Sequence, residues 1–164
     1  MNLSIDGLQL EREPLSRSEA YYCRNAAAVV IDARVIDALK AHLETTGGSL
    51  IRICLHSGPD DAMHEMVIVQ RRGLDFKPHK HLTKDESYHM LEGRLRVDFY
   101  DDSGRRTRSL TLGGPGSGLP SLLRVRCGVW HSTHPETDFT AVHESRPGPF
   151  TRNDSIAHTW DPRP

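Results

Sequence analysis

The sequence predicts an all-β domain that carries one N-terminal α-helix. Short segments of alternating apolar and polar residues recur between residues 49 and 144, and turns rich in Gly and Pro separate them. Alternation with a period of two is the pattern of a strand with one buried face, and many such strands at regular spacing are typical of a sandwich or barrel. The stretch from residue 32 to residue 47 has helical periodicity instead.

The predicted helix begins after Asp32, which can cap its N-terminus, and it ends at Gly47. Its apolar face consists of Val35, Ile36, Leu39 and Leu43. The predicted strands include residues 49–55, 63–70, 93–100, 106–112, 122–126 and 139–144. Residues 1–28 are polar and mixed, so we expect a peripheral lead-in there, followed by a single domain over residues 29–164.

Composition and charge argue against several classes of protein. The 21 Lys and Arg residues balance 22 Asp and Glu residues, so there is no electrostatic case for binding nucleic acid or an anionic membrane. Cys23, Cys54 and Cys127 form no CxxC pair, which favours reduced thiols. The N-terminus lacks the basic start and apolar stretch of a secretory signal, and the longest apolar run, residues 26–31, is too short to cross a bilayer. We therefore expect a soluble, cytoplasmic protein with a small-molecule substrate.

Four residues can meet around one ion. His79 and His81 are two residues apart, so on an extended strand both side chains leave the same face. Glu86 follows a four-residue bend and can approach from the returning strand. His131 can supply a fourth ligand, because strands distant in sequence line one cavity in a closed barrel. Three imidazoles and one carboxylate suit one divalent transition metal, namely Fe, Mn, Ni, Co or Zn, and four protein ligands leave an octahedral ion two open positions.

The spacing of these residues resembles the first motif of the cupin superfamily. The motif is a glycine, five residues, HxH, four residues, a glutamate, six residues and a glycine, here Gly73, His79, His81, Glu86 and Gly93. The second cupin motif is matched in part, by Gly128 and His131. It departs at Arg126, where a proline is usual, and at Pro135, where an asparagine is usual.

From roughly residue 30 to residue 160 the chain is also similar to the WbuC family of cupin-fold metalloproteins. The segments that carry this likeness include CLHSGPDDAMHEM, GRLRVDFYDDSGR, GVWH and ESRPGPF. The resemblance implies a cupin (jelly-roll-like) β-barrel that holds a metal. It also implies a place among proteins that occur with O-antigen and other surface-polysaccharide genes. Because cupins often pair through exchanged strands, we expect a homodimer, to which residues 1–28 could contribute.

Further candidates surround the expected metal. Tyr88 shares strand parity with Glu86 and should face inward, where its phenol could donate a proton or could simply pack in the core. The family resemblance favours Glu144 as an inward acid/base residue, and the alternative is a salt bridge at the rim. The candidates for the substrate pocket are His64, Arg124, Arg126 and Trp130. Arginine suits an anionic group, and Trp130 could be an aromatic shelf for a sugar or a packing residue.

These features favour a metal-dependent enzyme that acts on a small polar substrate such as a sugar or sugar nucleotide. The metal would polarise a carbonyl or hydroxyl while Glu144 or Tyr88 moves protons, as in an isomerase or epimerase. One alternative is an iron-dependent dioxygenase that uses the two open metal positions. The other is a non-catalytic, metal-stabilised module that binds or senses a carbohydrate.

Overall fold

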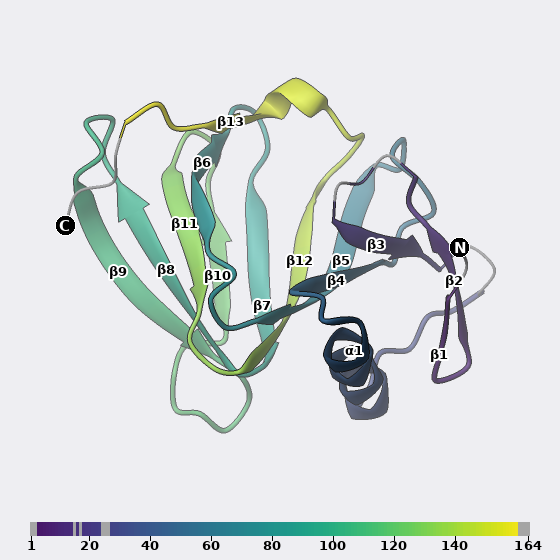
Figure 1. The fold of residues 1–164 in the computed structure, drawn as a ribbon. Helices are drawn as coiled ribbons and strands as arrows, with labels where there is room; N and C mark the ends of the chain where they lie inside the picture. Colours follow the sequence, from purple (N-terminus) through teal and green to yellow (C-terminus); the bar gives the residue numbers. More distant parts are fainter. Residues whose placement is uncertain (1–2, 15, 17, 24–26, 161–164) are drawn as a thin grey trace.

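Two β-sheets face each other in this chain, and an α-helix covers the outer side of the larger sheet (Figure 1). The computed structural model describes residues 3–14, 16, 18–23 and 27–160. The larger sheet contains, in spatial order, β1 (Leu3–Ile5), β2 (Leu8–Arg12), β3 (Glu19–Tyr22), β4 (Leu50–Cys54), β5 (Met63–Arg71), β12 (Phe139–Pro147), β7 (Glu86–Glu92) and β10 (Leu122–Val125). The smaller sheet contains β13 (Ser155–Ala157), β6 (Phe76–His81), β11 (Trp130–Pro135), β8 (Arg94–Tyr100) and β9 (Arg106–Gly113).

The helix confirms the sequence prediction at both ends. In α1 (Ala33–Thr46), Asp32 Oδ1 accepts hydrogen bonds from the backbone N–H groups of Arg34, at 2.9 Å, and Val35, at 3.2 Å. Gly47 ends the helix with φ = 69°, a left-handed conformation that glycine adopts without strain. All four predicted apolar residues are buried against the outer face of the larger sheet. In the part of the chain that the structure describes, no helix has the length and apolar character needed to cross a membrane.

The space between the two sheets holds a second apolar core. Side chains of the larger sheet, among them Met66, Ile68 and Val142, pack there against Leu95 and Val97 of the smaller sheet. Several residues of this core, among them Ile68, Leu95 and Val142, also line a cavity that polar residues share, as the next section describes. Strand β8 has the alternation that the sequence predicts, with Leu95 and Val97 almost fully buried.

Strands β6 and β7 are the expected strands of His79, His81 and Glu86, for which the prediction gives no bounds, and five further strands go beyond the predicted set. Three of them, β1, β2 and β3, lie within residues 1–28 and extend the larger sheet, in which β3 and β4 form a parallel pair. The others are β11, which pairs with both β6 and β8, and β13, which pairs with β6. Short strands with few alternating residues give little periodic signal, and their pairing depends on distant partners. The domain boundary at residue 28 stays a prediction.

The two glycines of the histidine motif lie at turns that require them. Gly73 has φ = 87° just before β6, and Gly93 has φ = 77° in the tight turn between β7 and β8. A Cβ atom at Gly93 would also collide with Thr137 Oγ1 and the carbonyl oxygen of Phe139. These turns therefore fix where β6 and β7 begin and end, and the two strands carry three of the predicted metal ligands.

Candidate metal centre

A carboxylate and two imidazoles meet between the sheets. Glu86 begins β7 in the larger sheet, whereas His79 on β6 and His131 on β11 are direct cross-strand partners in the smaller sheet. One ligand atom from each of these three residues lies within 4.8 Å of the other two. His131 Nε2 lies 2.7 Å from Glu86 Oε1, and the ring centroids of His79 and His131 are 4.4 Å apart. Glu86 and His131 are buried, so the cluster is largely removed from water.

Backbone carbonyl groups fix which nitrogen of each ring faces the carboxylate. His79 Nδ1 is 3.0 Å from the carbonyl oxygen of Lys77, and His131 Nδ1 is 3.1 Å from that of Val129. A carbonyl oxygen can only accept, so Nδ1 donates in both rings and Nε2 keeps its lone pair. An imidazole oriented in this way is ready to bind a metal through Nε2.

The contacts of Glu86 fit a cation at this position. Although His131 Nε2 is 2.7 Å away, the pair lacks hydrogen-bond geometry, and Glu86 Oε1 is buried without a hydrogen-bond partner among the described residues. A buried carboxylate oxygen without a partner is costly, and two lone pairs that face each other repel unless a positive charge lies between them. The donor set of two imidazoles and one carboxylate suits a divalent transition metal. These residues therefore fit the predicted metal, whose identity they do not select.

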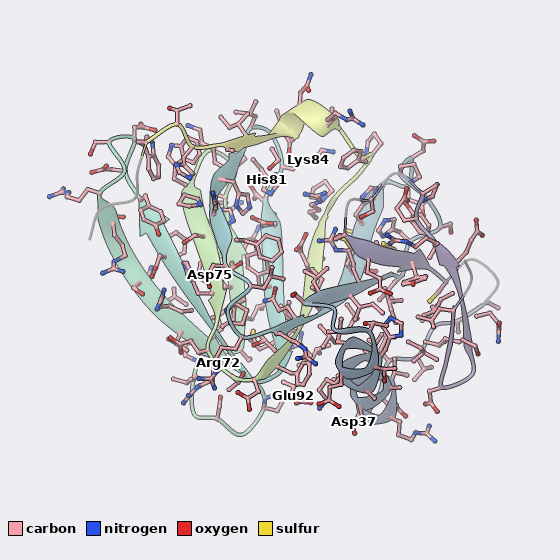
Figure 2. The ribbon with its side chains drawn as sticks, in the orientation of Figure 1. Asp37, Arg72, Asp75, His81, Lys84 and Glu92 are labelled. Carbon is pink, nitrogen blue, oxygen red and sulfur yellow. The ribbon has the colours of Figure 1, made fainter. Side chains whose placement is uncertain are left out.

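His81 lies beside this cluster and is not one of its three members. It lines the same cavity as His79, but its Nε2 is 3.4 Å from Glu86 Oε2 and its Nδ1 is 3.3 Å from Asp154 Oδ2. His81 is thus held between two carboxylates, one on β7 and one on η1 (Arg152–Asp154). Figure 2 shows His81 and Lys84 at the end of the sheets over which η1 passes. Of the four predicted ligands, the structure brings His79, Glu86 and His131 together. It places His81 beside Oε2 of Glu86, the oxygen that does not face His131.

Burial and neighbouring charges set the protonation of the cluster. Burial lowers the pKa of His79 to about 4, which favours the neutral, ligand form of this ring. Burial opposes ionisation of Glu86, but the adjacent imidazoles of His131 and His81 outweigh it and lower the pKa of the carboxyl group. Burial acts to lower the pKa of His81, but the neighbouring Glu86 outweighs this effect and raises the pKa of His81 above its ordinary value.

The two predicted proton-transfer residues lie next to each other. Tyr88 and Glu144 are cross-strand partners on β7 and β12, and both line the cavity. The Tyr88 hydroxyl is 3.4 Å from His131 Nε2. Burial and the charge of Glu86 raise the pKa of both groups, so each holds its proton to higher pH than in water. Their roles in catalysis stay predictions.

The cavity that these residues line has a volume of about 270 Å³. Five polar residues on its wall were not predicted from the sequence: Arg52 on β4, Gln70 on β5, Thr133 on β11, Arg146 on β12 and Ser155 on β13. Asp154, which faces His81, was not predicted either. One signal for Arg52 is present in the sequence, because it interrupts a run of apolar residues in a predicted strand.

The structure places the predicted substrate-pocket residues outside this cavity. Arg124 is exposed on β10, where the buried Val125 faces inward instead, and Arg124 and Arg126 both bind Asp85 Oδ2, at 3.0 and 2.8 Å. Trp130 precedes the inward His131, so strand alternation turns it to the opposite face. There its indole N–H donates to Asp102 Oδ1 at 2.9 Å.

His64 is the fourth of these residues, and it is buried in a neighbouring hollow. The hollow has a volume of about 80 Å³ and is lined also by Lys84, Arg146 and Arg152. The ring of His64 stacks on His56 with the centroids 4.1 Å apart. Because Arg146 and His81 line both spaces, the hollow adjoins the cavity.

Comparison with solved structures shows the predicted cupin fold. KdgF from Halomonas sp. is 14% identical with a TM-score of 0.50, and the match covers 64% of this chain and 83% of that chain. CapF, crystallised with the inhibitor 3-isopropenyl-tropolone, is 18% identical with a TM-score of 0.51, over 65% of this chain and 31% of that chain. The cupin domain of Schizosaccharomyces pombe Cnp3 is 12% identical with a TM-score of 0.48, over 60% and 64%. The chain thus matches less than two thirds of the CapF and Cnp3 chains.

Comparison of sequences gives the family. No curated protein matches the sequence. One family model, described as "Domain of unknown function (DUF6016)", matches residues 31–112, which make up half of the chain. This segment contains the helix, the strands β4 to β8 and the complete HxH motif with Glu86. The chain therefore belongs to the DUF6016 family and has a cupin fold with a candidate His/Glu metal centre.

Proposed function

We propose that this chain is a divalent-metal-dependent enzyme that acts on a small polar substrate, such as a sugar, by an isomerase- or epimerase-like proton transfer. One observation carries the proposal. The ligand atoms of His79, Glu86 and His131 lie within 4.8 Å of one another, and the cavity of about 270 Å³ beside them also contains Tyr88 and Glu144. A structural metal site is closed by protein ligands, whereas a catalytic site keeps a side open to substrate.

The chemistry follows from the neighbours of this cluster. A divalent ion held by His79, Glu86 and His131 would supply a Lewis acid that polarises a carbonyl or hydroxyl oxygen. The Glu144 carboxyl group, whose pKa burial raises, can give a proton to a substrate atom and take it back. Tyr88, its cross-strand partner, can hold a second proton at its hydroxyl oxygen. Apolar side chains on the same wall, Ile68 and Val142, limit the access of water.

The finer assignments are carried by the sequence resemblance. We propose that the chain is a WbuC-type cupin, that its substrate belongs to surface-polysaccharide metabolism, and that it works in the cytoplasm as a homodimer. The balanced charge supports a small-molecule substrate in preference to nucleic acid or a membrane surface.

The test combines metal analysis with solvent isotope exchange. Untagged protein should contain about one equivalent of a divalent transition metal, as expected for a single such site. His79→Ala should lose that metal and keep its fold, whereas the control His89→Ala, at an exposed position on β7, should keep both. In D₂O, the wild-type protein should move deuterium into a carbon next to the carbonyl of its sugar substrate, and Glu144→Gln should abolish that exchange with the metal still bound.

The outcomes separate the three candidate functions. A metal content far below one equivalent would overturn the proposal. Oxygen uptake with a sugar, without deuterium exchange, would favour the iron-dependent dioxygenase. If His79→Ala loses its metal and unfolds, and the wild-type protein binds sugars without exchange, the site stabilises a binding module instead.

A further inference from the structure

Two arginines on the cavity wall have no carboxylate partner among the described residues. Arg52 and Arg146 both line the cavity, and the buried Nε of Arg52 has no hydrogen-bond partner in the described part of the chain. Outside the cavity, Arg124 and Arg126 both bind Asp85. Arg71, whose buried Nε also has no hydrogen-bond partner among the described residues, has its guanidinium over the ring of Phe139 instead. A guanidinium that is partly desolvated and unpaired is unfavourable, so such a group indicates a place for an anion.

The register of the larger sheet directs both arginines to the same space as Glu144. Arg52 pairs with Ile68, and Ile68 pairs with Val142, so these three side chains share the inner face. On β12 the residues two and four positions beyond Val142 are Glu144 and Arg146, which therefore face inward as well. Both guanidinium groups are close enough to lower the pKa of Glu144, against the larger effect of burial.

The charges around the cavity do not balance without a ligand. A divalent ion beside Glu86, together with Arg52 and Arg146, gives an excess of positive charge. The excess remains when Glu144 is ionised. The ion and the two arginines then carry four positive charges, whereas Glu86 and Glu144 together carry two negative charges. In a cavity between two sheets, where charges are screened less than at the surface, an excess of this kind favours a negatively charged ligand.

We propose that the cavity binds a small organic acid, with its carboxylate held by Arg52 and Arg146 and a hydroxyl or carbonyl oxygen turned toward Glu86 and its histidines. The fork of donors on arginine matches a carboxylate. The cavity volume of about 270 Å³ lies just below the usual range of ligand pockets, about 300–1,000 Å³, which favours a compact acid such as a sugar acid over a nucleotide. The inference rests on the proposed metal-dependent function and names its substrate class.

The test compares D-gluconate with D-sorbitol, which differ only in the carboxylate that replaces one terminal CH₂OH group. Binding of each is measured by titration calorimetry or ligand-observed NMR on the full chain with its metal, whose content is determined for every sample. Gluconate should bind at least about tenfold more tightly than sorbitol, an energy that one charge-assisted contact can supply. Arg52→Met and Arg146→Met should each weaken gluconate about tenfold and leave sorbitol unchanged. The control Arg124→Met, outside the cavity, should alter neither.

Several results would overturn the inference. Equal binding of gluconate and sorbitol would do so, as would gluconate binding that both arginine variants leave unchanged. Inorganic phosphate that binds more tightly than gluconate through the same arginines would replace the carboxylate class by a phosphate class. Arg146 is half-buried near the end of β12, so its variant decides the question if Arg52→Met does not fold. A wild-type protein without metal that still binds gluconate through Arg52 and Arg146 would contradict the proposed function and support the anion site.

Discussion

The two faces of the larger sheet carry different kinds of side chain, although the same strands build both. On β4, Ile51 and Ile53 point outward into the core beneath α1, whereas Arg52 between them points into the cavity. On β5, Val69 belongs to the outer core and the adjacent Gln70 lines the cavity. Beneath α1 the outer face is apolar, and the inner face combines apolar residues with acids, imidazoles and arginines.

This difference separates stability from function within one sheet. Burial of apolar surface stabilises the fold by about 25 cal/mol per Å², and the outer core, with α1 over it, consists of such surface. Buried polar groups cost free energy unless they are paired, and Glu86 Oε1 and Arg52 Nε have no hydrogen-bond partner among the described residues. We infer that the outer face stabilises the sheet while the inner face keeps unpaired groups for a metal and a ligand.

The largest effect is expected from a substitution in the apolar core of the outer face. Leu39 on α1 is fully buried in the outer core, so Leu39→Ala should lower the free energy of unfolding by about 2–5 kcal/mol. Urea unfolding followed by circular dichroism measures this change. The control Glu44→Ala, exposed on the same helix, should change the stability by less than about 0.5 kcal/mol. Folded Leu39→Ala protein should bind metal as the wild type does, and a weaker metal affinity would show that the two faces are coupled.

The sequence predicts those parts of both faces that depend on local spacing. The helix follows from its cap and its apolar stripe, which involve contacts three or four residues apart. The meeting of His79 with Glu86 follows from a short strand, a bend and a returning strand. His131 lies much further along the chain, and its partnership with His79 was predicted only through the barrel and the second motif.

Residues that depend on long-range register could not be predicted. The inward direction of Arg52 depends on the pairing of β4 with β5 and of β5 with β12. Asp154 reaches His81 because the C-terminal β13 pairs with β6, although the two strands are far apart in the sequence. Arg124 and Arg126 were predicted at the pocket because arginine suits an anionic group. Strand alternation turns Arg124 away from the cavity, and both side chains bind Asp85 instead.

A smaller effect is expected when the inner face is changed without removing a metal ligand. Asp154 Oδ1 accepts hydrogen bonds from the Thr83 backbone N–H at 2.9 Å and the Thr83 hydroxyl at 2.6 Å, while Oδ2 faces His81 Nδ1 at 3.3 Å. Asp154→Asn can keep the bonds to Thr83 and place an amide N–H against His81. His81 would then accept at Nδ1 and donate from Nε2 to Glu86, so the carboxylate would bind a metal less well.

We expect Asp154→Asn to weaken metal affinity about 10- to 100-fold with little change in stability, the range typical of residues that orient metal ligands. Competition with a coloured chelator measures the affinity. The matched control is Asp138→Asn, which changes an exposed aspartate paired with Arg72 and should have no effect. An unchanged affinity in Asp154→Asn would mean that His81 does not influence the metal through Glu86.

The smallest effect concerns pH, and it also belongs to the inner side of the sheet. His56 and His64 stack with centroids 4.1 Å apart, and burial lowers the pKa of both below the ordinary value of 6.5. The charges of His56, Arg146 and Lys84 lower the pKa of His64 further, whereas Asp61 and Glu65 act in the opposite direction on His56. The folded protein therefore binds fewer protons than the unfolded chain as the pH falls below 6.5, and its stability decreases in that direction.

His64→Phe should reduce this loss of stability on the acid side. Phenylalanine keeps a ring on His56 but cannot take up a proton, and the carbonyl oxygen of Pro59 that faces His64 Nε2 still accepts from the Phe150 N–H at 2.6 Å. Unfolding in urea at about pH 7 and about pH 5 measures the difference for each protein. The wild type should lose more stability between the two than His64→Phe, and the control His89→Phe, at an exposed site, should behave as the wild type. Equal losses of stability in all three proteins would mean that His56 and His64 do not cause the pH response. The response would then be assigned to the metal ligands, whose titration a bound ion would suppress.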